Sequence, residues 1–386
     1  MEITKKIKES ISIRQEPELL AKQKLNTYML SQFFIQLVNF QQLIKSINEF
    51  VGKDKVMKSS VLLEGISLCV NNVIKSILNN RYDVDIQIKL LQKEIENLGI
   101  KASEIKIKSL YPRLVKIQVV VNKPSEQLLN GQLKLAFENL LGESLKVNAK
   151  KIRNKNIKID VSSHRNFKID HSVAYVGKDG SKISGDSYFY ENFSNGTSML
   201  AISDGMGNGE IARKESFEAL KVLKCLVNFD ISVKDAIKIL WDLKQNSNTD
   251  ERFFTLDVCL IDKEKQKANF YKQGATSTFL LRDNKVARIE MSGLPIGVVG
   301  CENIDQVTIK LEVDDVIIMC SDGIVDEFTD MQLFENRIIK NSGCSPKEVA
   351  KDLLDYTIEY SRGKVNDDML VLIAEYKNIK EKRSQI

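Results

Sequence analysis

Four aspartates in the C-terminal half of the chain stand where predicted β-strands begin or end. From such positions a carboxylate can leave its sheet and enter a shared cleft; the four are Asp186, Asp204, Asp322 and Asp367. Carboxylates gathered in one cleft repel one another strongly unless cations neutralise them. Because no histidine, cysteine or methionine is among them, the ligand set is all oxygen, which suits Mg²⁺ or Mn²⁺ and not zinc or copper.

This carboxylate set also indicates a class of reaction. Two hard divalent ions held about 3.5–4 Å apart activate a water and stabilise both oxygens in phosphoryl hydrolysis. Such chemistry requires no nucleophilic side chain. The aspartates therefore predict a metal-dependent hydrolase of phosphate esters.

Some of these residues have simpler interpretations. An Asp-Gly pair after a strand is often only a tight turn, and Asp179-Gly180 is expected to be one. The segment from Asp204 to Glu215 mimics a calcium loop, with glycine and glutamate at its sixth and twelfth positions. Met206 occupies the third position, where calcium requires a ligand, so we reject that interpretation.

Three glycines follow Asp204 at alternate positions, Gly205, Gly207 and Gly209. Their spacing matches neither the dinucleotide-binding glycine motif nor a Walker motif. We expect them to form a flexible lip before a helix, which lets a backbone carbonyl reach a metal.

Taken together, the motifs resemble the PPM (PP2C-type) phosphatases, and most closely the branch that contains stage II sporulation protein E. The resemblance covers about residues 165–376. Its motifs occur in the expected order: Ser184-Gly185-Asp186-Ser187-Tyr188, Ile202-Ser203-Asp204-Gly205-Met206-Gly207-Asn208-Gly209, Glu215-Ser216, Gly293-Leu294-Pro295-Ile296-Gly297, Ser321-Asp322-Gly323-Ile324 and Asp367-Asp368-Met369.

The resemblance implies a role for each candidate residue. It implies two Mn²⁺ or Mg²⁺ ions per site, with Asp204 bridging both and the carbonyl of Gly205 binding one. It further implies that Asp186 assists the second ion, whereas Asp322 and Asp367 hold the first. Asp204, Asp322 and Asp367 would then act in catalysis through metal-held water.

The fold that the resemblance implies is an α+β, PP2C-like sandwich of two antiparallel sheets flanked by helices. The implied reaction is hydrolysis of phosphoserine or phosphothreonine on a protein. In this branch the typical substrate is a phosphorylated anti-anti-sigma factor, whose dephosphorylation activates a sigma factor in sporulation.

Three departures from the family pattern are visible. Leu370 stands where relatives usually have threonine, which alters a hydrogen bond near the site and removes no ligand. The sequence shows no counterpart of the long membrane region of the sporulation phosphatase, so we expect either a soluble relative or an excised cytoplasmic part of a membrane-anchored protein. The arginine that larger relatives use to hold phosphate is also absent; Lys182 or Arg213 could replace it, and the alternative is that both are ordinary surface cations.

The first 160 residues contain no catalytic constellation. Apolar residues at helical spacing predict helices at 18–50, 61–78, 85–98 and 125–141, with strands at 105–110, 114–121 and 155–161. We expect a helical segment at 1–60, a small α/β regulatory domain at 61–162, the phosphatase domain at 163–378 and a tail at 379–386. The apolar stripe between Leu20 and Phe50 fits a homodimer through N-terminal helices and equally a helix folded back on the α/β domain.

Composition limits the alternatives. Residues 1–160 carry 27 Lys and Arg against 16 Asp and Glu, net +11, whereas residues 161–386 carry 30 against 36, net −6. The lysines of the basic half form no block and no aromatic platform, so we expect no nucleic-acid partner. The six cysteines show no metal-site spacing, so we expect reduced thiols. No apolar run reaches about 18 residues, so we expect no membrane span and a cytoplasmic chain.

Two other classes of function remain. A catalytically silent phosphatase-like scaffold would be expected to lack a ligand, yet all four aspartates are present. A hydrolase of a small phosphate ester would need aromatic side chains for recognition, and aromatics form only 7% of the chain and do not cluster near the aspartates. A protein substrate fits better.

Overall fold

The computed structural model describes residues 39, 41–47, 49–50, 89–100, 102–109, 115–122, 131–152, 156–164, 167–193, 196–207, 209–246, 252–263, 265–298 and 304–379. The described residues of Met1–Gln42 and Cys69–Ser163 form one compact unit, the small unit. Those of Leu43–Leu68 and His164–Ile386 form a second, the sandwich unit. No helix in these ranges has the length and apolar character that a membrane crossing requires.

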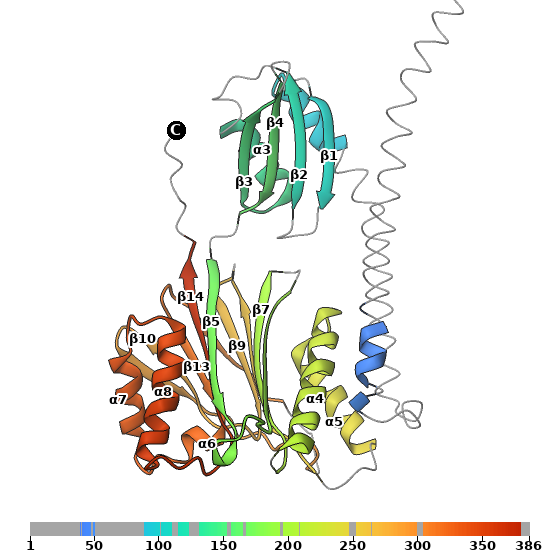
Figure 1. The fold of residues 1–386 in the computed structure, drawn as a ribbon. Coiled ribbons are helices and arrows are strands. Elements are labelled where there is room, and N and C mark those ends of the chain that lie inside the picture. Colours follow the sequence, from blue (N-terminus) through green and yellow to red (C-terminus); the bar gives the residue numbers. More distant parts are fainter. Residues whose placement is uncertain are drawn as a thin grey trace, which may run out of the picture. The chain divides into compact units, whose positions relative to one another are not determined.

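The small unit is an antiparallel sheet with two helices on one face. Its strands are β1 (Ala102–Ser109), β2 (Lys116–Asn122), β3 (Leu145–Lys151) and β4 (Asn156–Ser163), in the order β1-β2-β4-β3 (Figure 1). The alternate residues Ile117, Val119 and Val121 of β2 are buried, as period-two patterning requires. They pack against Phe137 of α3 (Leu133–Leu141) and Leu91 of a helix at 89–97.

The sequence predictions for this region are met in part. The strands predicted at 105–110 and 114–121 occur as β1 and β2, with ends displaced by one to three residues. Strand β3 was not predicted; only Leu145 of its seven residues is buried, so it lacks the apolar alternation that identifies a strand. The predicted helix 61–78 lies outside the described residues, as does most of the predicted helix 18–50, of which 39, 41–47 and 49–50 are helical.

Two five-stranded antiparallel sheets form the sandwich unit. One sheet has the order β11-β10-β13-β14-β5 and the other β12-β9-β8-β7-β6. The strands are β5 (Phe167–Val176), β6 (Asp186–Asn192), β7 (Thr197–Asp204), β8 (Leu256–Asp262), β9 (Lys267–Gln273), β10 (Thr278–Arg282), β11 (Lys285–Ile289), β12 (Val307–Lys310), β13 (Val316–Cys320) and β14 (Met369–Asn378).

Helices cover the outer faces of both sheets (Figure 1). Helices α4 (Glu210–Asn228) and α5 (Val233–Asn246) lie beside the β6–β7 sheet, and α7 (Met331–Lys340) and α8 (Pro346–Tyr360) lie against the β5–β14 sheet. A short helix, α6 (Asp322–Val325), follows β13. The predicted α+β sandwich of two antiparallel sheets is confirmed.

Strand β14 shows how the sandwich fills both of its interiors. Its alternate residues Leu370, Leu372 and Ala374 join a core with side chains from both sheets, such as Leu200. The intervening residues Met369, Val371 and Ile373 pack into a second core beneath α7 and α8. A strand covered on both faces is a continuous apolar run, and that run delivers Asp367 and Asp368 to one edge of the sheet.

Candidate metal centre

Strands β6 and β7 place two of the predicted ligands side by side. Asp186 opens β6 and Asp204 closes β7, and the antiparallel register pairs them directly. Directly paired residues project from the same face of a sheet. The end of β7 is fixed by Thr255, whose Oγ1 accepts the Asp204 N–H at 3.0 Å and whose own N–H donates to the Asp204 carbonyl at 2.8 Å.

The electrostatics of this pair are those of an uncompensated anionic site. Asp186 is only 6% exposed, and its carboxylate oxygens have no cationic partner and no well-formed hydrogen bond among the described residues, although the Ser321 side chain lies close enough to lower its pKa in part. Burial, and then the charge of Asp204, raise the pKa of Asp186 well above its usual range. Burial and the charges of Asp322 and Asp367 raise the pKa of Asp204 to about 7. A buried anion without partners is costly unless a cation joins it.

The other sheet contributes the second pair. Asp322 follows β13 and Asp367 precedes β14, and these strands are antiparallel neighbours whose ends meet at one edge. A side chain at Gly323 would overlap the backbone carbonyl of Asp368, so glycine permits this close approach. The pKa of Asp322 is raised, chiefly by burial and in part by the charge of Asp367.

Each sheet thus contributes one pair of the predicted ligands. The two pairs lie close enough for the charges of Asp322 and Asp367 to raise the pKa of Asp204. The described residues contain no group of three or more acidic, histidine or cysteine side chains arranged as a ready-made metal cluster. Asp367 is exposed, whereas Asp186 is buried. The donor set fits a hard divalent cation, because it offers only carboxylate oxygens and no softer ligand. One of these carboxylates, Asp186, is buried without a cationic partner among the described residues.

The glycine lip has the predicted place between β7 and α4. A side chain at Gly205 would overlap the backbone of Ala212, so the first turn of α4 lies directly against this residue. Gly207 and Gly209 adopt φ values of 95° and 80°, which favour glycine. Glu215, the twelfth residue of the rejected calcium loop, instead pairs with Lys244 of α5.

The candidate phosphate-binding cations and the unusual leucine have different surroundings. Lys182 and Arg213 are both exposed, and neither forms an ion pair with a described residue. Their role in holding phosphate stays a prediction. Leu370 is buried between the sheets, and its backbone N–H donates to Ser321 Oγ at 2.9 Å.

Sequence reasoning did not assign Ser216 and Asp368, which surround the backbone before Asp186. Asp368 is 3% exposed, and its Oδ1 and Oδ2 accept the N–H groups of Lys178 and Gly185. The Asp-Asp doublet is visible in the sequence, but only the folded chain shows which carboxylate is already occupied by backbone donors.

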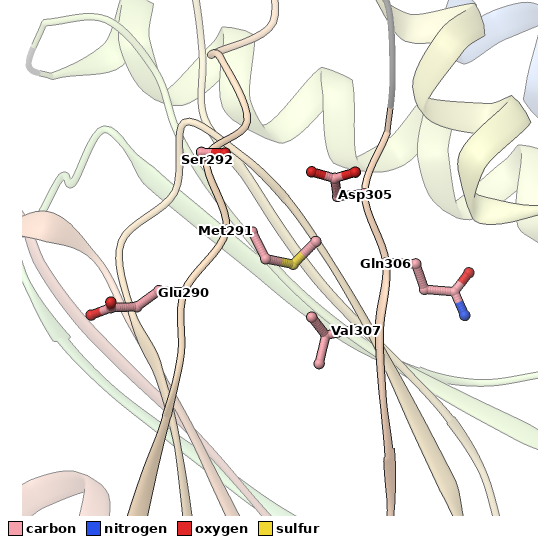
Figure 2. A pocket seen from close by; sticks show the side chains of 6 residues that line it. All are labelled: Glu290, Met291, Ser292, Asp305, Gln306 and Val307. Atoms are coloured by element: carbon pink, nitrogen blue, oxygen red, sulfur yellow. The ribbon is translucent and has the colours of Figure 1, made fainter.

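A hollow of about 660 Å³ lies elsewhere in the sandwich unit (Figure 2). Its wall consists of two segments, one after β11 and one leading into β12: Glu290, Met291, Ser292, Asp305, Gln306 and Val307. None of the four candidate ligands lines it. The candidate ligands and this hollow are therefore separate features of the sandwich unit.

A helical segment from the N-terminal region packs within the sandwich unit. Leu43 and Ile47 are fully buried. Glu49 pairs with Lys221 of α4 at 3.3 Å, and Ser46 Oγ lies 4.0 Å from Cys225 Sγ. This segment therefore contacts the helix that begins at the glycine lip.

Comparison with known proteins accounts for this architecture. Residues 194–377 match the family model of stage II sporulation protein E (SpoIIE). This segment is similar to SpoIIE. The chain is 31% identical over 333 residues to stage II sporulation protein E of Priestia megaterium, covering 84% of this chain and 57% of the relative. It is 28% identical to that of Bacillus subtilis strain 168, covering 83% of this chain and 40% of the relative.

The chain thus spans roughly half the length of these SpoIIE relatives. A solved structure of the PP2C phosphatase domain and a fragment of the regulatory domain of SpoIIE from Bacillus subtilis superposes with a TM-score of 0.70 at 26% identity. That match covers 82% of this chain and 96% of the solved one. The predicted resemblance to PP2C-type phosphatases, and to SpoIIE among them, is confirmed.

Proposed function

We propose that this chain is a metal-dependent protein serine/threonine phosphatase that acts on phosphoserine. The observation that carries the proposal is Asp186, a buried carboxylate with no cationic partner among the described residues, paired in register with Asp204. Asp322 and Asp367 would hold one Mn²⁺ or Mg²⁺ ion and Asp186 would assist in holding the other, with Asp204 a ligand of both and the Gly205 carbonyl a ligand of one. Such ions would stabilise the phosphoryl oxygens as Lewis acids and would lower the pKa of a bound water toward neutral pH.

The chain's own residues support hydrolysis by water. Cys320 precedes Ser321-Asp322, but burial raises the pKa of its thiol, so it stays protonated and is no nucleophile. Cys259 is buried with a raised pKa for the same reason. The carboxylates at the strand ends therefore hold ions and orient water, and no covalent intermediate is required.

A phosphorylated anti-anti-sigma factor is the substrate we propose, with sigma-factor activation in sporulation as the outcome. The confirmed resemblance to SpoIIE supports this choice. Met206, within the glycine lip, and Ile211, just after it, are 46% and 64% exposed. Exposed apolar side chains at a site favour a protein surface over a small ester. Such a substrate places the activity in the cytoplasm.

The first experiment measures phosphate release from a phosphoserine-bearing anti-anti-sigma factor with Mn²⁺, with and without a chelator. Wild type is compared with Asp204→Ala and Asp322→Ala, and with turnover of a small phosphate ester. We expect metal-dependent release that both substitutions abolish. A folded, metal-binding wild type that releases no phosphate from any phosphoprotein would favour the scaffold function, and faster turnover of the small ester would favour the esterase.

We further propose that residues 1–60 and 61–162 regulate the phosphatase domain at 163–378, with 379–386 as a tail. The contacts of Glu49 and Ser46 with Lys221 and Cys225 support a regulatory segment docked on the second half of α4. Removal of residues 1–50 should change regulation or oligomeric state, including a homodimer through these helices, more than intrinsic chemistry. Ile47→Asp should undock the segment without deleting it. Unchanged mass by light scattering and unchanged concentration dependence of activity in both variants would contradict this role.

A further inference from the structure

Gly185, the residue before Asp186, has both of its backbone polar groups bound by buried side chains. Asp368 Oδ2 accepts the Gly185 N–H at 2.6 Å, and the Ser216 hydroxyl donates to the Gly185 carbonyl at 2.7 Å. Ser216 is fully buried, and its Oγ also lies 2.7 Å from Ser187 Oγ. The residues on both flanks of Asp186 are therefore tied to the same serine.

Close packing makes this arrangement specific to glycine at position 185. A Cβ at Gly185 would lie 2.9 Å from Asp368 Oδ2, 3.0 Å from the Cβ of Ala212 and 3.3 Å from the Gly207 carbonyl. The start of α4, the lip and the doublet before β14 thus meet at one backbone position. Any displacement of α4 along its axis would be transmitted through Ser216 to the start of β6.

Among the described residues, Asp368 differs from its neighbour Asp367, of which only Oδ1 accepts a backbone N–H, that of Asp368 at 2.9 Å. Both oxygens of Asp368 already accept backbone N–H groups, from Lys178 at 2.8 Å and from Gly185. A carboxylate so engaged is a poor candidate for a metal ligand and a strong anchor for the loop that it binds. The loop 178–185, which ends at Asp186, is therefore anchored at both ends by one side chain.

We propose that Ser216 and Asp368 are positioning residues for the Asp186 carboxylate, a pair that we call the Gly185 clamp. The clamp rests on the proposed metal site but contains none of its ligands. Side chains that orient a ligand typically change metal affinity 10- to 100-fold when they are removed. The clamp should therefore control how well the site with Asp186 binds a divalent ion.

The test titrates Mn²⁺ alone into the full-length chain by calorimetry, so it needs no phosphatase activity. We expect Ser216→Ala to weaken Mn²⁺ binding about 10- to 100-fold. The matched control is Ser198→Ala, because Ser198 is equally buried and donates to Asn192 at 2.6 Å at the opposite end of the β6–β7 pair. It should match the wild-type affinity while losing a comparable hydrogen bond.

A second variant makes the result independent of one substitution. Asp368→Asn keeps the shape of the side chain but leaves one of the two N–H groups without an acceptor, so it should weaken Mn²⁺ binding in the same direction. Wild-type affinity in both Ser216→Ala and Asp368→Asn, or equal losses in Ser216→Ala and Ser198→Ala, would overturn the clamp. A wild type that binds Mn²⁺ but hydrolyses no phosphoprotein would overturn only the proposed function, and one that binds no Mn²⁺ would overturn both.

Discussion

The small unit and the sandwich unit both contain antiparallel sheets, but they differ in how deeply their ion-paired side chains are buried. In the small unit the ion pairs lie on the surface, such as Lys106 with Glu104, whose side chains are 41% and 42% exposed. In the sandwich unit Lys272 and Asp257 form a pair with 0% and 2% exposure. When only one face of a sheet is covered, charged side chains can lie on the other face in solvent. When both faces are covered, a charged side chain is buried and requires a partner of opposite charge.

Two buried carboxylates of the sandwich unit sharpen this comparison. Asp257 Oδ2 binds Lys272 at 2.6 Å and accepts the Thr278 hydroxyl at 2.7 Å. Asp186 is similarly buried but has no such partner among the described residues. The first is a structural charge with its cation built in, and the second has the environment of a site whose cation comes from solution.

The largest expected effect is on phosphatase activity, and it should distinguish a carboxylate of the sandwich unit from a carboxylate of the small unit. Asp204→Asn should lower metal-dependent phosphate release at least about a thousandfold, because metal catalysis contributes several kcal/mol and about 1.4 kcal/mol corresponds to tenfold. The control is Asp160→Asn on β4 of the small unit, which should retain activity. Comparable losses in both variants, measured with Mn²⁺ on the same phosphoprotein, would contradict the assignment.

The buried ion pair should give the next largest effect, on stability. Lys272→Met leaves Asp257 buried without its cation and should lower the free energy of unfolding by about 3–5 kcal/mol. Trp241, the only tryptophan in the chain, is buried in α5, so its fluorescence reports unfolding of the sandwich unit. The exposed Lys158→Met in the small unit is the control and should leave this unfolding transition unchanged. Adding Asp257→Leu to Lys272→Met should restore most of the loss; no recovery would mean that packing, and not charge, carries the effect.

A substitution in the core of the small unit should destabilise that unit without destabilising the sandwich unit. Ile159→Ala removes a fully buried side chain from β4 and should destabilise that unit by about 2–5 kcal/mol. Hydrogen exchange should accelerate in β1 to β4 while the Trp241 fluorescence transition stays in place. A parallel shift of that transition would show that the two units unfold as one.

The smallest expected effect concerns a helix end in the sandwich unit. Ser345 and Glu348 form a capping box at the start of α8, with Pro346 in its first turn. Ser345→Ala should lower the free energy of unfolding by about 1 kcal/mol, measured by denaturant titration. Ser342→Ala, at an exposed turn position three residues earlier, should change it by less than about 0.5 kcal/mol. Equal effects would argue against the cap.

Strongly patterned elements of the sandwich were predictable. The strand ends beside Asp186, Asp204, Asp322 and Asp367 were predicted, and β6, β7, β13 and β14 begin or end at these residues or within two positions of them. Strand β12 was not predicted, since it is a short edge strand whose residues are at most half-buried. Helices α7 and α8 were not predicted either, although the capping box of α8 is legible in the sequence.

The resemblance to SpoIIE, the α+β sandwich and the candidate ligands could be predicted from the residues, because motifs and carboxylate chemistry are properties of the linear chain. The burial of Asp186 opposite Asp204, and the binding of two backbone N–H groups by Asp368 next to an exposed Asp367, became visible only in the folded chain. These distinctions depend on strand register and on contacts between residues up to 190 positions apart. No local pattern encodes them, since the same Asp-Asp doublet could present either carboxylate until β14 is placed in its sheet.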